Sequence, residues 1–367
     1  MAWPRITRPA LLLDETKCRA NIARIAAKAR AGAVRLRPHF KTHQAATVAA
    51  WYRAEGVTQC TVSSVAMAEY FAKHGWHNIN IAFPVNPLEG ERINELAAHI
   101  QLHVCVENRH AIRLLAPQLT HAVHVWIEID TGYHRTGVQP DDDETIGGLL
   151  SEISAHPQLR FRGFLAHAGH TYQCRSAAHV LETCAAAEAK LHAVGARYQT
   201  AYPDLELSTG DTPGCSLATS FAPATEIRPG NLVFYDLTQH AIGACAPEQI
   251  ALAVACPVVA IYPEREEVYV HGGAVHLSKD ALLLPNGATS YGQPVQLSET
   301  EWRFAWPGSY VKSLSQEHGK IHLPHHHLRE IQVGDVIGIV PVHACLTADA
   351  MRQYVTASGQ HIEMMPK

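Results

Sequence analysis

The stretch RLRPHFKTHQ, residues 35–44, places a lysine where a strand-like run meets a helical pattern. Val34 and Leu36 are the apolar positions of an alternating run, and Pro38 breaks that run before Lys41 is reached. An ordinary surface lysine prefers water and polar company. Lys41 therefore needs a specific explanation, and the segments on either side of it supply one.

Outward from this stretch, strand-like and helix-like segments alternate from Asp14, which caps the first helical pattern, to about Ala244. Several strand-like segments are continuously apolar, as parallel strands covered on both faces tend to be. The eight candidates are AVRLRPHF, QCTVS, NINIAF, QLHVCV, HAVHVWIEID, RFRGFLAH, LELST and NLVFYD. This α/β alternation predicts a (β/α)8 TIM barrel over residues 14–244. A doubly wound sheet is the alternative, but no Gly-x-Gly-x-x-Gly follows the first strand.

Residues 245–367 have a different pattern, with strand-like runs separated by Gly, Pro and Asn turns and few helical segments. We expect a second, mostly β C-terminal domain here, which residues 1–13 could join.

Composition narrows the class of partner. The chain has 367 residues, 47% of them hydrophobic and 17% charged, and a net charge of −4. A chain with this charge balance has no excess of positive charge with which to bind nucleic acid or an anionic membrane. A small molecule is therefore the expected partner. The nine cysteines are scattered without CxxC pairs, which favours reduced thiols and a cytoplasmic location. No segment approaches the roughly 20 apolar residues that span a bilayer.

In a barrel, catalytic groups lie at the C-terminal ends of the strands, where Lys41 is predicted to be. A partly desolvated lysine there can act as an amine nucleophile toward a carbonyl. Arg135 lies in DTGYHRTGV, residues 130–138, after the fifth predicted strand, and is suited to an anionic oxygen. The alternatives are a lysine that reaches solvent and an arginine in a surface ion pair.

Two turns near the end of the predicted barrel could hold a phosphate. STGDTPG, residues 208–214, follows a strand and precedes a helix, so its backbone N–H groups and the Thr212 hydroxyl could bind one. RPGN, residues 228–231, follows one strand later, and phosphate sites in these barrels favour the loops after the last two strands. Each could also be a simple turn.

His343 and Cys345 stand two residues apart in PVHACLTADA, so in a strand they would point to the same face. One imidazole nitrogen and one thiolate suit zinc, and two protein ligands would leave an open site. The alternative is a buried cysteine beside a histidine with a structural role.

Taken together, these segments resemble the D-serine dehydratase and D-threonine aldolase family of pyridoxal phosphate enzymes, which has the alanine racemase-like fold. The matching motifs occur in the family's order and cover nearly the whole chain: RPHFKTH, DTGYHRTGV, FLAHAGHTY, STGDTP, EIRPGNLVFYD, SLSQEHG and GDVIGIVPVHACLT.

The resemblance implies roles for particular residues. Lys41 would bind pyridoxal phosphate covalently, and Lys41 and Tyr172 would be the catalytic residues. Arg135 would contact the phenolic oxygen of the cofactor or its surroundings. The phosphate would be held by Gly210, Asp211, Thr212, Gly230 and Asn231, and a divalent metal by His343 and Cys345. Because a carboxylate repels a phosphate, we expect the Asp211 side chain to point away from it.

The resemblance also implies the reaction. A dehydratase would remove the α-proton and β-hydroxyl of a D-amino acid such as D-serine or D-threonine, giving a 2-oxo acid and ammonia. An aldolase would cleave Cα–Cβ of D-threonine or 3-hydroxy-D-aspartate instead. A histidine–cysteine pair favours Zn²⁺ over Mn²⁺ or Mg²⁺ and favours the dehydratase. A pyridoxal phosphate-binding carrier protein and a racemase are the further alternatives, and a homodimer is expected.

Overall fold

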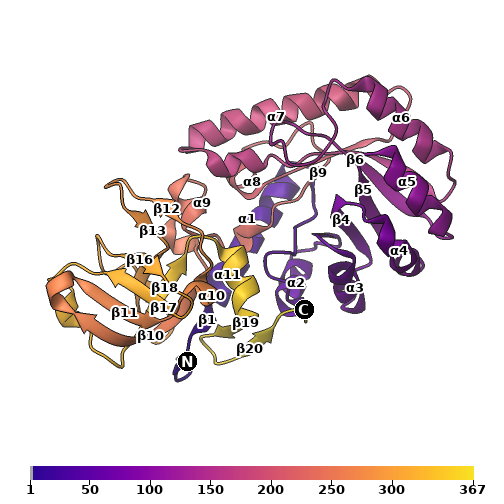
Figure 1. The fold of residues 1–367 in the computed structure, drawn as a ribbon. Helices are drawn as coiled ribbons and strands as arrows, with labels where there is room; N and C mark the ends of the chain where they lie inside the picture. The colour runs from indigo at the N-terminus through magenta and orange to yellow at the C-terminus, as the bar shows by residue number, and fades with distance from the viewer. Residues whose placement is uncertain (1–2) are drawn as a thin grey trace. The chain divides into compact units, whose positions relative to one another are not determined.

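The computed structural model describes residues 3–367. Its contacts divide the chain into two compact units: one comprises Ala23–Gly230, and the other joins the residues up to Ile22 to Asn231–Lys367 (Figure 1). The predicted domains, 14–244 and 245–367, overlap these units over most of their length. Within the described residues, no helix is long and apolar enough to cross a membrane.

The first unit is built on an eight-stranded parallel sheet in the order β2-β9-β8-β7-β6-β5-β4-β3. Its edges are joined by a parallel bridge between His39 and Thr61, with hydrogen bonds from Phe40 N–H to Thr61 O (2.8 Å) and from Thr61 N–H to Pro38 O (2.9 Å). The strands are β2 (Arg35–Leu36), β3 (Cys60–Val62), β4 (Asn78–Pro84), β5 (Gln101–Val106), β6 (Val123–Glu128), β7 (Leu159–Leu165), β8 (Glu206–Thr209) and β9 (Glu226–Ile227). The predicted (β/α)8 barrel is confirmed.

Helices connect these strands. They are α1 (Glu15–Ala31), α2 (Ala46–Ala54), α3 (Val65–Lys73), α4 (Gly90–Ala97), α5 (Arg109–Leu115), α6 (Asp143–Ser154), α7 (Ala177–Tyr198) and α8 (Thr212–Leu217). Asp14 caps α1 as predicted, because its Oδ1 accepts the Lys17 N–H at 3.0 Å.

One predicted strand is wrong. NLVFYD does not join the sheet: Asn231–Val233 form a 3-10 helix, and the eighth barrel strand is the short β9 just before it. A short apolar run is compatible with either a strand or a buried helical turn, so its composition alone could not separate them.

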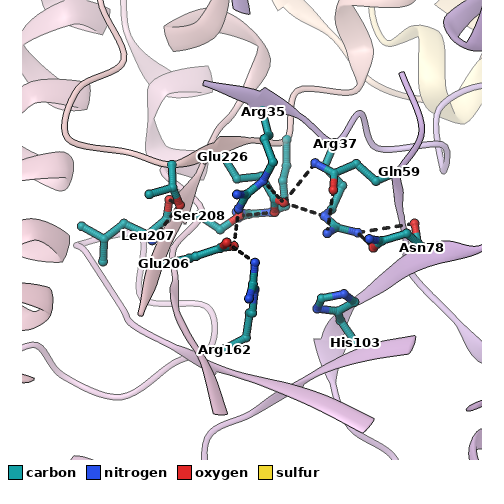
Figure 2. A network of polar contacts seen from close by, with 12 residues as sticks. Arg35, Arg37, Gln59, Asn78, His103, Arg162, Glu206, Leu207, Ser208 and Glu226 are labelled. Carbon is teal, nitrogen blue, oxygen red and sulfur yellow. Dashed lines mark hydrogen bonds and ion pairs between the residues drawn. The ribbon is translucent and has the colours of Figure 1, made fainter. Parts of the chain in front are cut away.

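A network of charged side chains lies at the N-terminal ends of the barrel strands (Figure 2). Arg37 donates to Glu226 Oε2 at 2.8 Å and to Asn78 Oδ1 at 2.6 Å. Ser208 donates to the other oxygen of Glu226 at 2.6 Å, and Glu206 accepts from Arg35 and Arg162. Burial raises the pKa of Glu226, but Arg37 and Ser208 outweigh that effect and hold it below its usual value. The network therefore ties β2, which has only two residues, to its neighbours.

The second unit is mostly β, as predicted. Its ten-stranded sheet contains β15-β14-β18-β10-β1-β19-β20, with β11, β17 and β16 attached beside β10. The strands are β1 (Ala10–Leu13), β10 (Leu252–Tyr262), β11 (Glu267–His271), β14 (Gly292–Leu297), β15 (Trp302–Arg303), β16 (Tyr310–Leu314), β17 (His318–His322), β18 (Val336–Pro341), β19 (Gln353–Thr356) and β20 (His361–Glu363). A separate hairpin pairs β12 (Leu282–Leu283) with β13 (Thr289–Ser290).

Three short helices complete this unit: α9 (Leu237–Ala241), α10 (Ala274–Leu277) and α11 (Ala344–Met351). α11 corrects a second prediction, since the run DVIGIVPVHACLT is strand only as far as Pro341 and His343 is the N-cap residue of a helix. His343 and Cys345 therefore do not lie on one face of a strand.

Candidate active site

Lys41 lies just beyond the C-terminal end of the first barrel strand, where catalytic groups of such barrels gather. The chain passes from β2 through Pro38 to the bridge at His39, and Lys41 follows as an exposed residue. The Lys41 N–H donates to His39 Nδ1 at 3.3 Å. The structure thus places the lysine at the end of the barrel opposite the charged network.

Two half-buried imidazoles, those of His39 and His167, lie among the cations at this end of the barrel. Burial lowers the pKa of His39, and the charges of Lys41, Arg228 and Arg135 lower it further. The pKa of His167 falls to about 3, first through burial and then through the same three cations. His167 Nδ1 lies 2.9 Å from Gly210 O, so its neutral ring donates there and leaves Nε2 as an acceptor. Both histidines are uncharged members of a cationic site.

Arg228 is a residue that the sequence analysis did not select. It is 5% exposed and donates to Ser208 Oγ and, at 2.6 Å, to Ala166 O. Both acceptors are uncharged. The carboxylates of Glu226 and Glu128 act on the guanidinium through their charge rather than as its hydrogen-bond acceptors, so an anion could still pair with it directly. Arg228 is the first residue of RPGN, which the sequence analysis selected as a phosphate-binding turn without a role for the arginine.

The loop after β6 presents Arg135. The guanidinium lies 5.3 Å from the centre of the Tyr133 ring, and the loop is held by Asp130, whose Oδ1 accepts the N–H groups of Gly132 (2.9 Å) and His134 (3.0 Å). Gly137 has φ +105, and a Cβ there would lie 2.7 Å from Asp130 N, so only glycine fits. The loop conformation that carries Arg135 is therefore fixed by backbone contacts.

The predicted phosphate turn connects β8 to α8. Gly210 has φ +137, and a Cβ would lie 2.6 Å from Arg228 N. Asp211 caps α8: its Oδ1 accepts the Gly214 N–H at 2.6 Å and the Thr171 hydroxyl at 2.8 Å. The Asp211 carboxylate is thus held by Thr171 and by the first turn of α8.

Tyr172 lies beside this turn, because the Thr212 N–H donates to its hydroxyl at 3.4 Å. Gly230 approaches the lysine segment closely, since a Cβ would lie 2.9 Å from His39 O and 3.2 Å from Thr42 Oγ1. Within the barrel unit, the structure thus brings the predicted cofactor residues to one end.

The second unit contains the predicted metal ligands. Asp236 Oδ2 accepts the Ala344 N–H at 2.9 Å and Asn231 Nδ2 at 2.6 Å. The same Asn231 amide nitrogen lies 3.6 Å from Cys345 Sγ. The side chain of Asn231, predicted to bind phosphate, is therefore engaged beside the thiol, and its backbone remains the group that could meet a phosphate.

The residues present fit both groups that the motifs imply. For pyridoxal phosphate, the charges of Lys41, Arg135 and Arg228 act together on His39 and His167, so an anionic cofactor would meet three cationic side chains at this end of the barrel. For a metal, His343 and Cys345 provide a borderline-soft donor pair. Asn231 Oδ1, buried and without a partner among the described residues, is an acceptor that a metal-bound water could satisfy.

A further group of potential ligands lies elsewhere in the second unit. Among residues 3–367, His271, His276 and Glu317 are the one set of three whose donor atoms lie within 4.8 Å of one another. The Gly273 N–H donates to His276 Nδ1 at 3.2 Å, so the neutral ring carries its proton on Nε2, 3.9 Å from Glu317. The His276 nitrogen that faces Glu317 therefore carries a proton, where a metal would need a lone pair.

Comparison with known proteins identifies the family. The model of the alanine racemase N-terminal domain matches residues 13–237, and that of a serine dehydratase domain matches residues 251–357. The chain is 31% identical to D-threo-3-hydroxyaspartate dehydratase of Delftia sp. (strain HT23), over 94% of this chain and 93% of that protein. It is 27% identical to D-serine dehydratase of Dictyostelium discoideum, over 95% and 93% of the two chains.

Solved structures agree with these sequence matches. The Delftia dehydratase superposes with a TM-score of 0.90 at 28% identity, covering 99% of this chain and 98% of that one. A cysteine-to-alanine variant of the same enzyme, described as a metal-free form, gives a TM-score of 0.89 at 29% identity, with 99% and 98% coverage. The chain therefore belongs to the D-serine dehydratase and D-threonine aldolase family of pyridoxal phosphate-dependent lyases, which has the alanine racemase-like fold.

Proposed function

We propose that this protein is a pyridoxal phosphate- and metal-dependent dehydratase, which converts a D-β-hydroxy-amino acid into a 2-oxo acid and ammonia. D-Serine, D-threonine and 3-hydroxyaspartate are the candidate substrates. The observation that carries the choice of reaction is the pairing of an imidazole with a thiol, His343 with Cys345, at the start of α11. A thiolate suits Zn²⁺ better than Mn²⁺ or Mg²⁺, and the metal-free cysteine variant of the Delftia dehydratase supports a thiolate ligand.

The cationic end of the barrel would hold the cofactor. Lys41 would bind it covalently, and the backbones of Gly210, Asp211, Thr212, Gly230 and Asn231 would meet its phosphate. Arg135 and Arg228 would favour its anionic form, and neutral His39 and His167 would add no further charge. Tyr172 would lie beside it.

Pyridoxal phosphate, when bound, supplies an electron sink for the charge left on Cα, and a divalent metal supplies Lewis-acid assistance at the β-hydroxyl. The chain supplies the proton transfers. With the cofactor and substrate bound, Lys41 Nζ would be the general base that takes the α-proton. A lysine at the end of the first strand therefore serves both as anchor and as base.

Product analysis with D-threonine, pyridoxal phosphate and Zn²⁺ tests the reaction class. We expect 2-oxobutanoate and ammonia. Glycine and acetaldehyde would instead indicate an aldolase, and binding without turnover of D-threonine, D-serine or 3-hydroxyaspartate would indicate a carrier protein. Lys41→Ala should abolish turnover and the visible absorption of the bound cofactor, whereas Lys73→Ala, an exposed lysine on α3, should change neither.

The family resemblance supports a homodimer, and the nine free cysteines support a reducing, cytoplasmic environment. Sedimentation of the holoenzyme should give twice the mass of the chain, and a monomeric active species would contradict the dimer.

A further inference from the structure

The imidazole of His343 contacts a carboxylate that the family motifs did not include. His343 Nδ1 lies 3.3 Å from Asp280 Oδ2, and the two side chains are 38% and 37% exposed. A neutral imidazole has one N–H donor and one bare nitrogen. If Nδ1 carries the proton and donates it to Asp280, Nε2 is the nitrogen left with a lone pair.

Asp280 is held in place by its own turn. The Ser278 hydroxyl donates to Asp280 Oδ2 at 2.9 Å, and the Asp280 N–H donates back to Ser278 Oγ at 3.3 Å. Ser278 has φ +66, an uncommon value for a residue with a Cβ, and its N–H closes α10 on Ala274 O at 3.0 Å. The turn therefore adopts a sparsely populated conformation while its hydroxyl aims the carboxylate.

A second hydrogen bond connects the Ser278–Asp280 turn to the helix that begins at His343. Thr347 on α11, fully buried, donates its hydroxyl to Leu277 O at 3.2 Å. Leu277 ends α10 just before Ser278, and His343 is the N-cap residue of α11. The geometry of the Asp280–His343 pair is thus set by two helices that hydrogen-bond to each other.

We propose that Asp280 is a positioning residue of the metal centre: it fixes the His343 ring with Nδ1 protonated and Nε2 directed at the metal. Metal-binding histidines commonly donate their second nitrogen to a carboxylate, which sets the tautomer and strengthens the ligand. Asp236 and Asn231 play the corresponding part for Cys345. The inference rests on the metal site of the proposed function. It assigns Asp280 to His343, whereas Cys345 is supported by the Asn231 amide, which Asp236 holds.

Two substitutions separate positioning from direct coordination. Asp280→Ala removes the acceptor, whereas Asp280→Asn keeps an oxygen that can accept the Nδ1 proton but removes the charge. If Asp280 positions His343, metal affinity should be highest in wild type, lower in Asp280→Asn and lowest in Asp280→Ala. A direct ligand predicts that both variants lose the metal equally.

The probe is Co²⁺, titrated into the metal-free full-length protein and measured by its d–d absorption, its thiolate-to-cobalt charge-transfer band and competition with a chelator. We expect Asp280→Ala to weaken Co²⁺ binding by about 10- to 100-fold. The charge-transfer intensity per bound Co²⁺ should persist, because Cys345 still coordinates. Asp349→Ala on α11, whose carboxylate is 40% exposed, is the matched control and should bind as wild type.

The positioning role of Asp280 and the metal site itself can be tested separately. If His343→Ala abolishes binding while Asp280→Ala binds Co²⁺ as wild type does, the positioning role is wrong and the metal site stands. Equal loss in Asp280→Asn and Asp280→Ala would also overturn it, in favour of a ligand. If wild type shows no thiolate-to-cobalt band, the metal site itself is wrong. Unfolding midpoints of the metal-free variants should match wild type, which excludes general destabilisation as the cause.

Discussion

Arg228 carries a charge that the barrel interior does not neutralise through its hydrogen bonds, which end on Ser208 and Ala166. A cation in a poorly solvated place interacts strongly with an anionic ligand. We predict that Arg228→Met weakens pyridoxal phosphate binding by at least about tenfold, roughly 1.4 kcal/mol. Spectrophotometric titration of the apoprotein measures this. Arg160→Met, an exposed arginine on β7, should bind normally, and equal affinity in both variants would contradict the role.

The carboxyl group of Glu188 makes the folding stability of the protein depend on pH. Burial, and then the charge of Asp211, raise the pKa of this α7 carboxyl to about 7. Since the folded state holds the proton more tightly than the unfolded chain, stability falls as pH rises from the unfolded value toward 7.

Glu188→Gln should therefore be more stable than wild type at pH 8, by about 1 kcal/mol after allowance for solvent screening, and similar to it at pH 4. Denaturant unfolding of the apoprotein at the two pH values measures the difference. Glu182→Gln, on the exposed side of the same helix, should show no such crossover. A constant gap between Glu188→Gln and wild type would refute the titration as its cause.

At the residue scale, prediction from sequence succeeded where a motif fixed the backbone. Lys41 and Arg135 follow strand ends, and the topology delivers them to one end of the barrel. Arg228 and Asp280 were missed for a common reason: their roles come from partners distant in sequence, Ala166 and Ser208 for one and His343 for the other. Nothing in the adjacent letters distinguishes them from an arginine or aspartate in an ordinary turn.

Among the elements, α8 shows how a six-residue helix can organise a binding turn. Asp211→Ala removes its cap, while the Thr171 hydroxyl keeps Ala168 O as an acceptor at 2.8 Å. We therefore predict a loss of about 1 kcal/mol in stability, mainly from the cap. Cofactor affinity should fall as well, because the cap fixes the backbone of Thr212.

Asp142→Ala is the matched control, since Asp142 caps α6 by accepting the Thr145 N–H at 2.9 Å. It should cost stability and leave pyridoxal phosphate affinity unchanged. Denaturant unfolding and cofactor titration of both variants separate the two effects. If the affinity losses are equal, the cap does not organise the turn.

Element types were hardest to predict where the segments are short. NLVFYD and the end of DVIGIVPVHACLT contain residues that favour strands, but Asp236 makes hydrogen bonds that suit helices in both places. It caps α9 locally by accepting the Gln239 N–H, and it accepts the distant Ala344 N–H at the start of α11. Periodicity needs more residues than these turns provide. The longer helices and the apolar strands carried enough pattern for a correct assignment.

For the whole molecule, the order of alternating segments was sufficient to predict the barrel and a β-rich second part. The contacts that close the barrel could not be identified from the sequence. They are the bridge between His39 and Thr61 and the charged network in which Arg37 reaches Glu226 near the far end of the barrel sequence.

Removing Glu226 would leave Arg37, whose side chain is 3% exposed, as an unpaired buried charge. We predict that Glu226→Ala destabilises the protein by about 3–5 kcal/mol. Glu69→Ala, which breaks the surface pair with Arg92, should cost less than about 1 kcal/mol. Denaturant midpoints of the two variants provide the comparison, and similar values would show that closure does not depend on the network.

The position of β1 has a consequence for synthesis on the ribosome. This strand pairs with β10 on one side and with β19, residues 353–356, on the other. This segment is synthesised before either partner. Its Leu11–Leu13 side chains therefore remain without β10 until residue 255 and without β19 until residue 356 have been added. All the barrel strands have been synthesised once β9 is complete at Ile227, so the barrel can fold while the rest of the chain is still being made. We therefore expect the Leu11–Leu13 side chains to stay without their sheet partners until β10 and then β19 have been synthesised.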